Sequence, residues 1–211
     1  MGKTLITEKD ILAAKRSGKS EIELTSVSLV TPLAKDRAKE FGIKLISKLK
    51  ATKPLPEPSQ LTIAIGSDHS GFQTKTDLKK LLADKNYRLL DFGTDSESSC
   101  DYPDFAEKVG EAVRTGRATF GIMIDGVGTA SAIVLNKMPG IRAALCYNEF
   151  SAQIARGHGN ANVLTLGARA LGIEVIKRIV TTFITTPFEG ERHQTRLSKV
   201  EAIEKKFLKT Y

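Results

Sequence analysis

Short apolar runs alternate with helix-like segments along the chain from residue 61 onward. The runs have the length and composition of buried strands, and they cover residues 61–65, 87–91, 120–124, 141–145 and 163–166. Between them, segments such as TKTDLKKLLADK and DFAEKVGEAVRTG repeat apolar residues at the spacing of amphipathic helices. This alternation predicts an α/β fold with a five-stranded parallel sheet and helices on both faces.

The first 53 residues follow a different pattern, with two short helices among strand-like stretches. Thr7 can cap the first helix and Gly18 can end it. Thr31 can cap the second helix, which has Pro32 at its first position and Gly42 as its stop. The stretches EIEL and IKLI alternate like short strands, and no tandem repeat is evident. We expect a small α+β extension with a marginal core that docks onto a partner.

A proline-rich stretch, KPLPEPS at residues 53–59, separates the two patterns. Its closely spaced prolines favour an extended, semi-rigid spacer. The sequence therefore predicts an N-terminal extension at residues 1–53, a linker at 54–60 and the main domain at 61–211.

The net charge of +8 lies mainly in the extension, where 12 Lys and Arg face 6 Asp and Glu. These basic residues are interleaved with acids and accompanied by one aromatic residue, Phe41, so a solvated surface is favoured over nucleic-acid binding. No apolar run approaches the ~20 residues that cross a membrane, and the N-terminus lacks an apolar signal sequence. Cys100 and Cys146 form no CxxC pattern and are expected to be reduced thiols. We expect a soluble protein of the cytoplasm.

Polar residues follow two of the predicted strands directly. Asp68 and His69 come after the first strand, and Asp125 comes after the third. Parallel sheets bind ligands outside the carboxyl ends of their strands, so these residues are candidates for a binding site. Gly126 and Gly128 follow Asp125 and could form a backbone nest for an anion, although the loop is not a GxGxxG dinucleotide fingerprint.

The remaining histidines and a pair of arginines are further candidates. His158 lies in a Gly-flanked break after a predicted helix, and His193 lies in the stretch FEGERHQTR. Arg192 and Arg196 are four residues apart and share one helical face, which suits a phosphate group. A metal site made of His69, His158 and His193 is a less favoured alternative, because their spacing matches no compact zinc pattern.

The stretches GSDHSGF, DYPDFAEKV, NKMPGIRAALCYNEFSAQIAR, HGNANVLTLGAR and FEGERHQTR closely resemble the ribose-5-phosphate isomerase B and galactose-6-phosphate isomerase family. The resemblance runs from about residue 61 to residue 204. It implies a Rossmann-like three-layer α/β/α sandwich that forms homodimers or homotetramers with active sites shared between two subunits. It also implies a metal-independent aldose–ketose isomerase without a cofactor, which opens a sugar-phosphate ring and forms an enediolate.

The resemblance also implies roles for individual residues. His158 corresponds to the ring-opening residue. Asp68 and His69 correspond to residues that contact the sugar and its phosphate. Arg192 and Arg196 correspond to a phosphate clamp supplied across the dimer interface.

The chain departs from the family in the two loops that carry most of the chemistry. Relatives typically have Cys-Gly-Thr-Gly where this chain has Asp125, Gly126, Val127 and Gly128, and that Cys is the usual proton-shuttling base. A second branch of the family places a Glu six residues later, where this chain has Ser131.

The familiar Gly at position 130 is Ala130, and the usual HND triplet becomes His158, Gly159 and Asn160. We assign Gly126, Gly128 and Asn160 to substrate binding.

Asp125 then has three possible roles. A carboxylate can act as the base that carries the proton between C1 and C2. It can instead bind sugar hydroxyls without transferring a proton, or it can simply cap the following loop. We expect a sugar-phosphate isomerase with Asp125 and His158 as catalytic residues. The alternative from another class is a catalytically silent sugar-phosphate binding module with a role in regulation or assembly.

The extension resembles segments of proteins from bacterial microcompartments through ITEKDILAAKRSGKSEIEL and LVTPLAKDRAKEFGI. This resemblance implies that residues 1 to about 50 tether the isomerase domain to a microcompartment shell or its cargo. The alternative is a local extension that packs on its own dimer.

Overall fold

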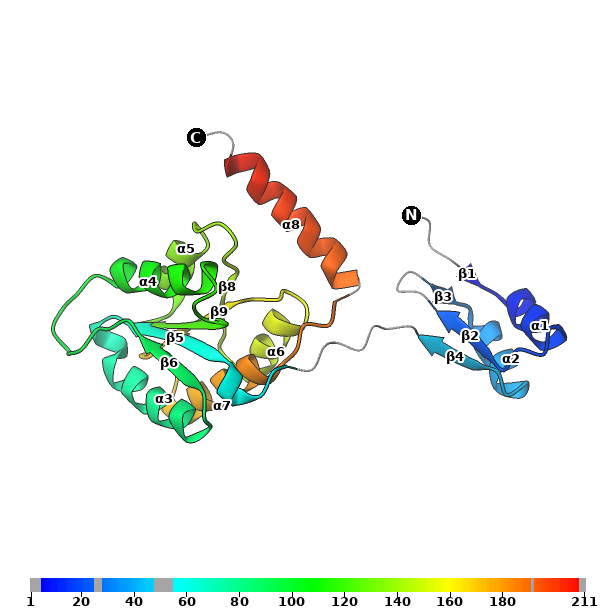
Figure 1. The fold of residues 1–211 in the computed structure, drawn as a ribbon, viewed down its shortest axis with the longest axis horizontal. Helices are drawn as coiled ribbons and strands as arrows, with labels where there is room; N and C mark the ends of the chain where they lie inside the picture. Colours follow the sequence, from blue (N-terminus) through cyan, green and yellow to red (C-terminus); the bar gives the residue numbers. More distant parts are fainter. Residues whose placement is uncertain (1–4, 25–27, 48–54, 191, 209–211) are drawn as a thin grey trace. The chain divides into compact units, whose positions relative to one another are not determined.

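The computed structural model describes residues 5–24, 28–47, 55–190 and 192–208. The chain forms two compact units, which are drawn in Figure 1. One unit is Met1–Lys53 with Glu191–Arg196, and the other is Pro54–Gly190 with Leu197–Tyr211. The end of the expected linker, Pro58–Gln60, forms the 3-10 helix η1, while residue 54 lies outside the described residues. In the described ranges, no helix is long and apolar enough to span a membrane.

The larger unit is built on a five-stranded parallel sheet, as the alternation of apolar runs predicts. Its strands are β5 (Thr62–Ser67), β6 (Arg88–Asp91), β7 (Phe120–Asp125), β8 (Ala143–Leu145) and β9 (Val163–Gly167). They lie in the order β6-β5-β7-β9-β8, and every neighbouring pair is parallel. Each strand overlaps one of the predicted runs, so the expected α/β fold is confirmed.

Helices cover both faces of this sheet (Figure 1). Helices α3 (Phe72–Asp84), α6 (Glu149–Gly157) and α7 (Ile173–Thr185) pack on one face, and α4 (Tyr102–Arg114) and α5 (Thr129–Leu135) pack on the other. The strand period of two explains the two cores, because Ile122 and Ile124 of β7 join one cluster and Met123 joins the other. The expected three-layer α/β/α sandwich is therefore confirmed.

A last helix, α8 (Arg192–Leu208), follows the sandwich. Its Glu204 carboxylate accepts a hydrogen bond from the backbone N–H of Gly140 at 2.9 Å. This bond ties the second half of α8 to the loop before β8.

The order of the strands reverses between β5 and β7. After β5 the chain adds β6 on one side, and it then crosses to add β7 on the other side. In open α/β sheets, ligands bind in the crevice outside the carboxyl ends of the strands at such a switch point. The loops after β5 and β7 are therefore the first place to look for a site.

The smaller unit contains more strands than the sequence predicts. Its elements are β1 (Leu5–Ile6), α1 (Glu8–Arg16), β2 (Glu21–Leu24), β3 (Leu29–Val30), α2 (Pro32–Glu40) and β4 (Lys44–Ser47). β2 and β4 match the expected strands, whereas β1 and β3 are too short to produce a visible period. β1 pairs with β3 and β2 pairs with β4, both in parallel.

The two halves of the small unit repeat one another. We did not expect this repeat, because no tandem repeat is evident in the sequence. Thr7 and Thr31 cap the two helices, and Gly18 and Gly42 follow them with φ angles of 68° and 65°. Both pairs are 24 positions apart, and both helices have nine residues. The repeat was missed because it rests on caps and small residues rather than on shared large side chains. Together the halves enclose a small apolar core.

Candidate active site

The candidate site begins where β5 and β7 end side by side. Ser67, the last residue of β5, lies opposite Ile124 in the strand register. The backbone N–H of Asp68 donates a hydrogen bond to the Ile124 carbonyl at 3.1 Å. Asp68 and Asp125 therefore leave neighbouring strands at the same edge of the sheet, at the switch point.

Asp68 is almost buried and organises the turn that follows it. Its Oδ1 accepts hydrogen bonds from the backbone N–H and hydroxyl of Ser70 and from the backbone N–H of Gly71, at 2.9, 2.6 and 3.1 Å. These bonds cap the 3-10 helix η2 (His69–Gly71). Asp68 thereby fixes the direction in which His69 leaves the sheet.

His69 is half-buried and is held in one tautomer by its neighbour. Its Nδ1 accepts the backbone N–H of Cys100 at 3.3 Å, so a proton of the neutral ring lies on Nε2, from which it can donate to a ligand. The Cys100 Sγ lies 4.0 Å from the same Nδ1. The sequence gives no sign of this contact, since nothing in it places residue 100 beside residue 69.

A buried lysine holds the loop that brings Cys100 to this edge. Lys75 of α3 is 2% exposed, and its Nζ donates to the Asp91 carboxylate at 2.6 Å and to the Thr94 carbonyl at 2.8 Å. Burial opposes the charge of Asp91, but hydrogen bonds from Lys75 and Lys79 outweigh that effect and lower the pKa of the Asp91 carboxyl. Asp91 therefore stays ionised as the anchor of this loop.

Asp125 makes four hydrogen bonds to the loop and helix that follow it. Its Oδ1 accepts the backbone N–H of Val127 at 2.9 Å and the backbone N–H of Gly128. Its Oδ2 accepts the backbone N–H and the hydroxyl of Ser131, at 2.9 and 2.5 Å. The side chain is 3% exposed. A carboxylate has about four lone-pair sites, so the loop itself occupies all of them.

The two glycines of this loop differ in how strongly the structure restricts a side chain at their positions. Gly128 has a φ of 82°, and a Cβ there would lie 2.5 Å from Leu145 and 2.9 Å from the backbone of Leu166. Gly126 is less constrained, because a Cβ would come no closer than 3.6 Å to Ser70 and 3.9 Å to Arg169. Gly128 therefore shapes the turn, whereas a Cβ at Gly126 would make only ordinary van der Waals contact with Ser70 and Arg169.

His158 and Asn160 lie in a turn between α6 and β9. Asn160 has a φ of 43°, and its side-chain oxygen accepts a hydrogen bond from Arg156 at 2.9 Å. Arg156 also donates to the Ala161 carbonyl at 2.6 Å, and Arg142 donates to the Asn160 carbonyl at 2.9 Å. Burial, together with the nearby charge of Arg142, lowers the pKa of Arg156 to about 10. Two arginines thus fix this turn.

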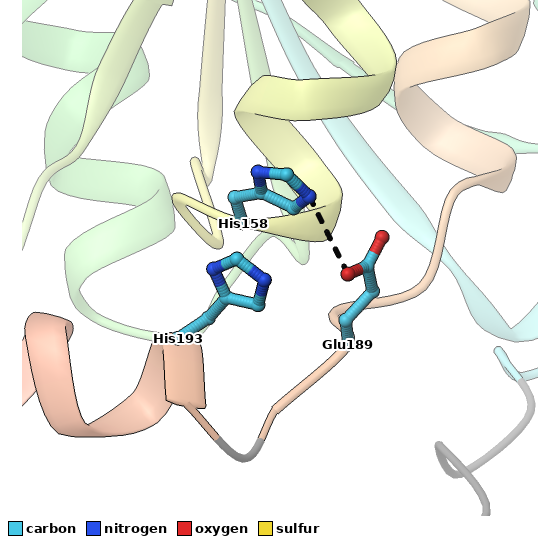
Figure 2. Close-up of side chains that lie close together, drawn as sticks. All are labelled: His158, Glu189 and His193. Carbon is cyan, nitrogen blue, oxygen red and sulfur yellow. Dashed lines mark ion pairs between the residues drawn. The ribbon is translucent and has the colours of Figure 1, made fainter. Parts of the chain in front are cut away.

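Glu189 pairs with His158, and sequence reasoning did not single it out. The His158 Nε2 lies 3.4 Å from a carboxylate oxygen of Glu189, as the dashed line in Figure 2 marks. The backbone N–H of Glu189 donates to the Gly157 carbonyl at 2.9 Å. The only feature of the sequence that could have indicated a role for Glu189 is its position in the FEGERHQTR stretch.

Arg192 and Arg196 are exposed in the first turns of α8, one helical turn apart. Arg192 also donates from Nε to the Nε2 of His193 at 3.2 Å. Within the described part of the chain, one group of three side chains has atoms that could hold a metal ion within 4.8 Å of one another. These side chains are His158, Glu189 and His193, which Figure 2 shows.

The candidate residues fall on two opposite edges of one sheet. Asn162 accepts the backbone N–H of Gly121 at the start of β7, so the His158 turn lies at the amino edge. Asp125 ends the same strand four residues later, about 13 Å further along at ~3.3 Å per residue. One chain therefore brings Asp68, His69 and Asp125 together, but separates them from His158. His69 and His158 lie at opposite edges of the sheet, so the alternative metal site made of His69, His158 and His193 cannot form within one chain.

Comparisons with known proteins agree with this fold and site. Residues 63–200 match the ribose/galactose isomerase family. Ribose-5-phosphate isomerase B of Escherichia coli is 40% identical over 144 residues, which are 68% of this chain and 97% of that protein. A protein named D-erythrulose-4-phosphate isomerase in Pectobacterium atrosepticum is 36% identical over 141 residues, 66% of this chain and 93% of its own.

The solved structure of Clostridium thermocellum ribose-5-phosphate isomerase B superposes with a TM-score of 0.69. It is 45% identical and covers 70% of this chain and 99% of its own. The larger unit is therefore a sugar-phosphate isomerase domain in its architecture. The chain belongs to the ribose/galactose isomerase family.

Replacing Asp125 by Asn is expected to destabilise the protein. The amide nitrogen of Asn is a donor, so two of the four donors around Asp125 would face another donor rather than an acceptor. A buried donor left unpaired costs about 1–3 kcal/mol, and we expect a loss of that size in urea unfolding. Asp101→Asn is the matched control, since Asp101 is exposed and makes no side-chain cap. Equal stability of the two variants would contradict the proposed hydrogen-bonding role.

Proposed function

We propose that the protein is an aldose–ketose isomerase that interconverts ribose 5-phosphate and ribulose 5-phosphate, or a related pair of pentose or hexose phosphates. The observation that carries this proposal is the gathering of Asp68, His69 and the Asp125 loop at the switch point of a domain 40% identical to ribose-5-phosphate isomerase B. The reaction opens the sugar ring and then moves a proton between C1 and C2 through an enediolate.

The remaining roles follow the family. His158 exchanges a proton with the ring oxygen, and Asn160 shapes the turn that presents it. Asp68 and His69 contact the sugar and its phosphate, and the half-buried His69 ring can donate from Nε2. The exposed pair Arg192 and Arg196 holds the phosphate. Gly126 and Gly128 present the loop backbone to the sugar.

Two groups are candidates for the proton shuttle. Asp125 stands where relatives usually carry the catalytic Cys, but a proton can reach its oxygens only if one of its four hydrogen bonds is released. Its contacts support a loop-holding role more directly. Cys100 is the second candidate, because its thiol lies at the same edge beside His69, and a thiol is the usual base of the family.

A panel of phosphorylated sugars tests the activity, and two variants assign the shuttle. We expect turnover by the wild type together with exchange of the C2 proton into D2O, measured by NMR. Cys100→Ala should reduce that exchange by ~10²-fold or more, and Asp125→Asn should retain part of it. Loss in Asp125→Asn with retention in Cys100→Ala would instead make Asp125 the base. Binding of sugar phosphates without turnover or exchange would favour a silent binding module.

We also propose that a second copy of the chain completes the site. The support is the separation of the His158 turn from Asp125 across the sheet, because neither edge alone holds both a ring-opening group and a proton shuttle. A two-fold dimer can bring the amino edge of one copy to the carboxyl edge of the other. A dimer, or a tetramer built from such dimers, therefore has two composite sites per pair.

Mixing two inactive variants tests this arrangement. His69→Ala damages the carboxyl edge and His158→Ala damages the amino edge, so a mixed dimer keeps one site with both wild-type halves. After subunit exchange, we expect about a quarter of wild-type turnover, since half of the dimers are mixed and each has one intact site. His69→Ala mixed with Cys100→Ala is the control, because both changes lie at the carboxyl edge. No recovery above this control would place the complete site within one chain.

For the small unit we propose a tethering role in a bacterial microcompartment. The role is assigned to residues 1–53 alone, and it is supported by their own apolar core and their net charge of +6. The match to the family covers residues 63–200 and leaves residues 1–53 outside it.

Deleting residues 1–53 should leave sugar-phosphate turnover within about twofold, because none of the proposed site residues lies in this segment. The same deletion should abolish co-sedimentation with microcompartment shells from a host that produces them. Unchanged co-sedimentation would contradict tethering, and a shift in oligomeric state would point to packing on its own dimer.

A further inference from the structure

We propose that Glu189 is a positioning residue for His158, and that the two form a carboxylate–imidazole dyad for opening the sugar ring. This inference rests on the proposed isomerase function. Its basis is the approach of the Glu189 carboxylate to the His158 Nε2 at 3.4 Å, seen in Figure 2. A carboxylate that faces one ring nitrogen fixes the tautomer and the orientation of an imidazole.

The backbone places Glu189 beside His158. Glu189 lies in the segment after α7, and its N–H bonds to the Gly157 carbonyl at 2.9 Å. Gly157 ends α6 immediately before His158 and is buried. The backbone bond therefore locks the two segments side by side, which an exposed ion pair between mobile side chains does not do.

Gly157 also leaves room for the carboxylate itself. A Cβ at this position would lie 2.9 Å from Glu189 Oε1 and 3.5 Å from the carboxylate carbon. With a side chain at 157, the carboxylate at the end of the flexible Glu189 side chain would have to shift from this position.

The step that His158 serves is the opening of the sugar ring. In ring opening, the bond between C1 and the ring oxygen breaks, and the ring oxygen takes a proton from His158. The anomeric hydroxyl loses its proton to water as its electrons form the C1 carbonyl, and His158 is then reprotonated from water. Protons and electrons balance without a further reactant.

Glu189→Gln tests the dyad on ring and open-chain substrates. Ribose 5-phosphate must be opened, whereas erythrose 4-phosphate has no free hydroxyl that can close a five-membered ring. We expect kcat for ribose 5-phosphate to fall by about tenfold, less than the ~10²–10⁴-fold contributed by a group that transfers the proton itself, with little change in KM. Turnover of erythrose 4-phosphate should change by less than about twofold. Glu189→Asp should recover part of the loss.

A direct measurement of ring opening accompanies the kinetics. Exchange between the α and β anomers of ribose 5-phosphate, followed by NMR, should slow in Glu189→Gln by the same factor as kcat. If erythrose 4-phosphate is not turned over, this anomer exchange alone decides whether Glu189 positions His158. Glu174→Gln is the matched control, since Glu174 is an exposed carboxylate paired with Lys177 on α7.

The outcomes separate this inference from the proposed function. Equal losses for both substrates, or unchanged anomer exchange in Glu189→Gln, would overturn the positioning role while leaving the isomerase intact. A wild type that exchanges anomers but forms no ketose would overturn the isomerase function, and slowed exchange in the variant would still support the dyad. A wild type that neither exchanges anomers nor isomerises would overturn both.

Discussion

The hydrogen bonds of the Asp125 carboxylate hold together the loop on which the carboxyl edge of the site depends. One side chain satisfies backbone N–H groups of Val127, Gly128 and Ser131, and it is buried while doing so. A buried anion is tolerated only when it is fully hydrogen-bonded, and this loop supplies that condition. The same bonds start α5 and set the turn at Gly128, so the shape of the loop depends on this one side chain.

The Asp125 loop lies beside two other anchored segments at the carboxyl edge. Asp68 and His69 follow β5 beside β7, and the loop of Cys100 is anchored by the buried Lys75. In the proposed mechanism, proton transfer between carbons takes place at this carboxyl edge, and ring opening takes place at the turn of His158 and Glu189 at the amino edge.

Much of the fold could be read from the sequence, because buried parallel strands are continuous apolar runs and amphipathic helices separate them. The placement of Asp68, His69 and Asp125 at strand ends also followed from this pattern. The pairing of Cys100 with His69 and of Glu189 with His158 did not, since each joins residues 31 positions apart through loops without a period. The repeat in the small unit escaped because two-residue strands carry no measurable alternation.

The occupied lone pairs of Asp125 also could not be predicted. The sequence allowed a base, a sugar contact or a cap, and only the positions of four donors distinguish these roles. The most direct test is a crystal structure with bound ribose 5-phosphate. It should show both Asp125 oxygens still bonded to Val127, Gly128 and Ser131, with the C2 carbon of the sugar closer to the Cys100 sulfur than to Asp125. An Asp125 oxygen released from Ser131 and directed at C2 would contradict this account.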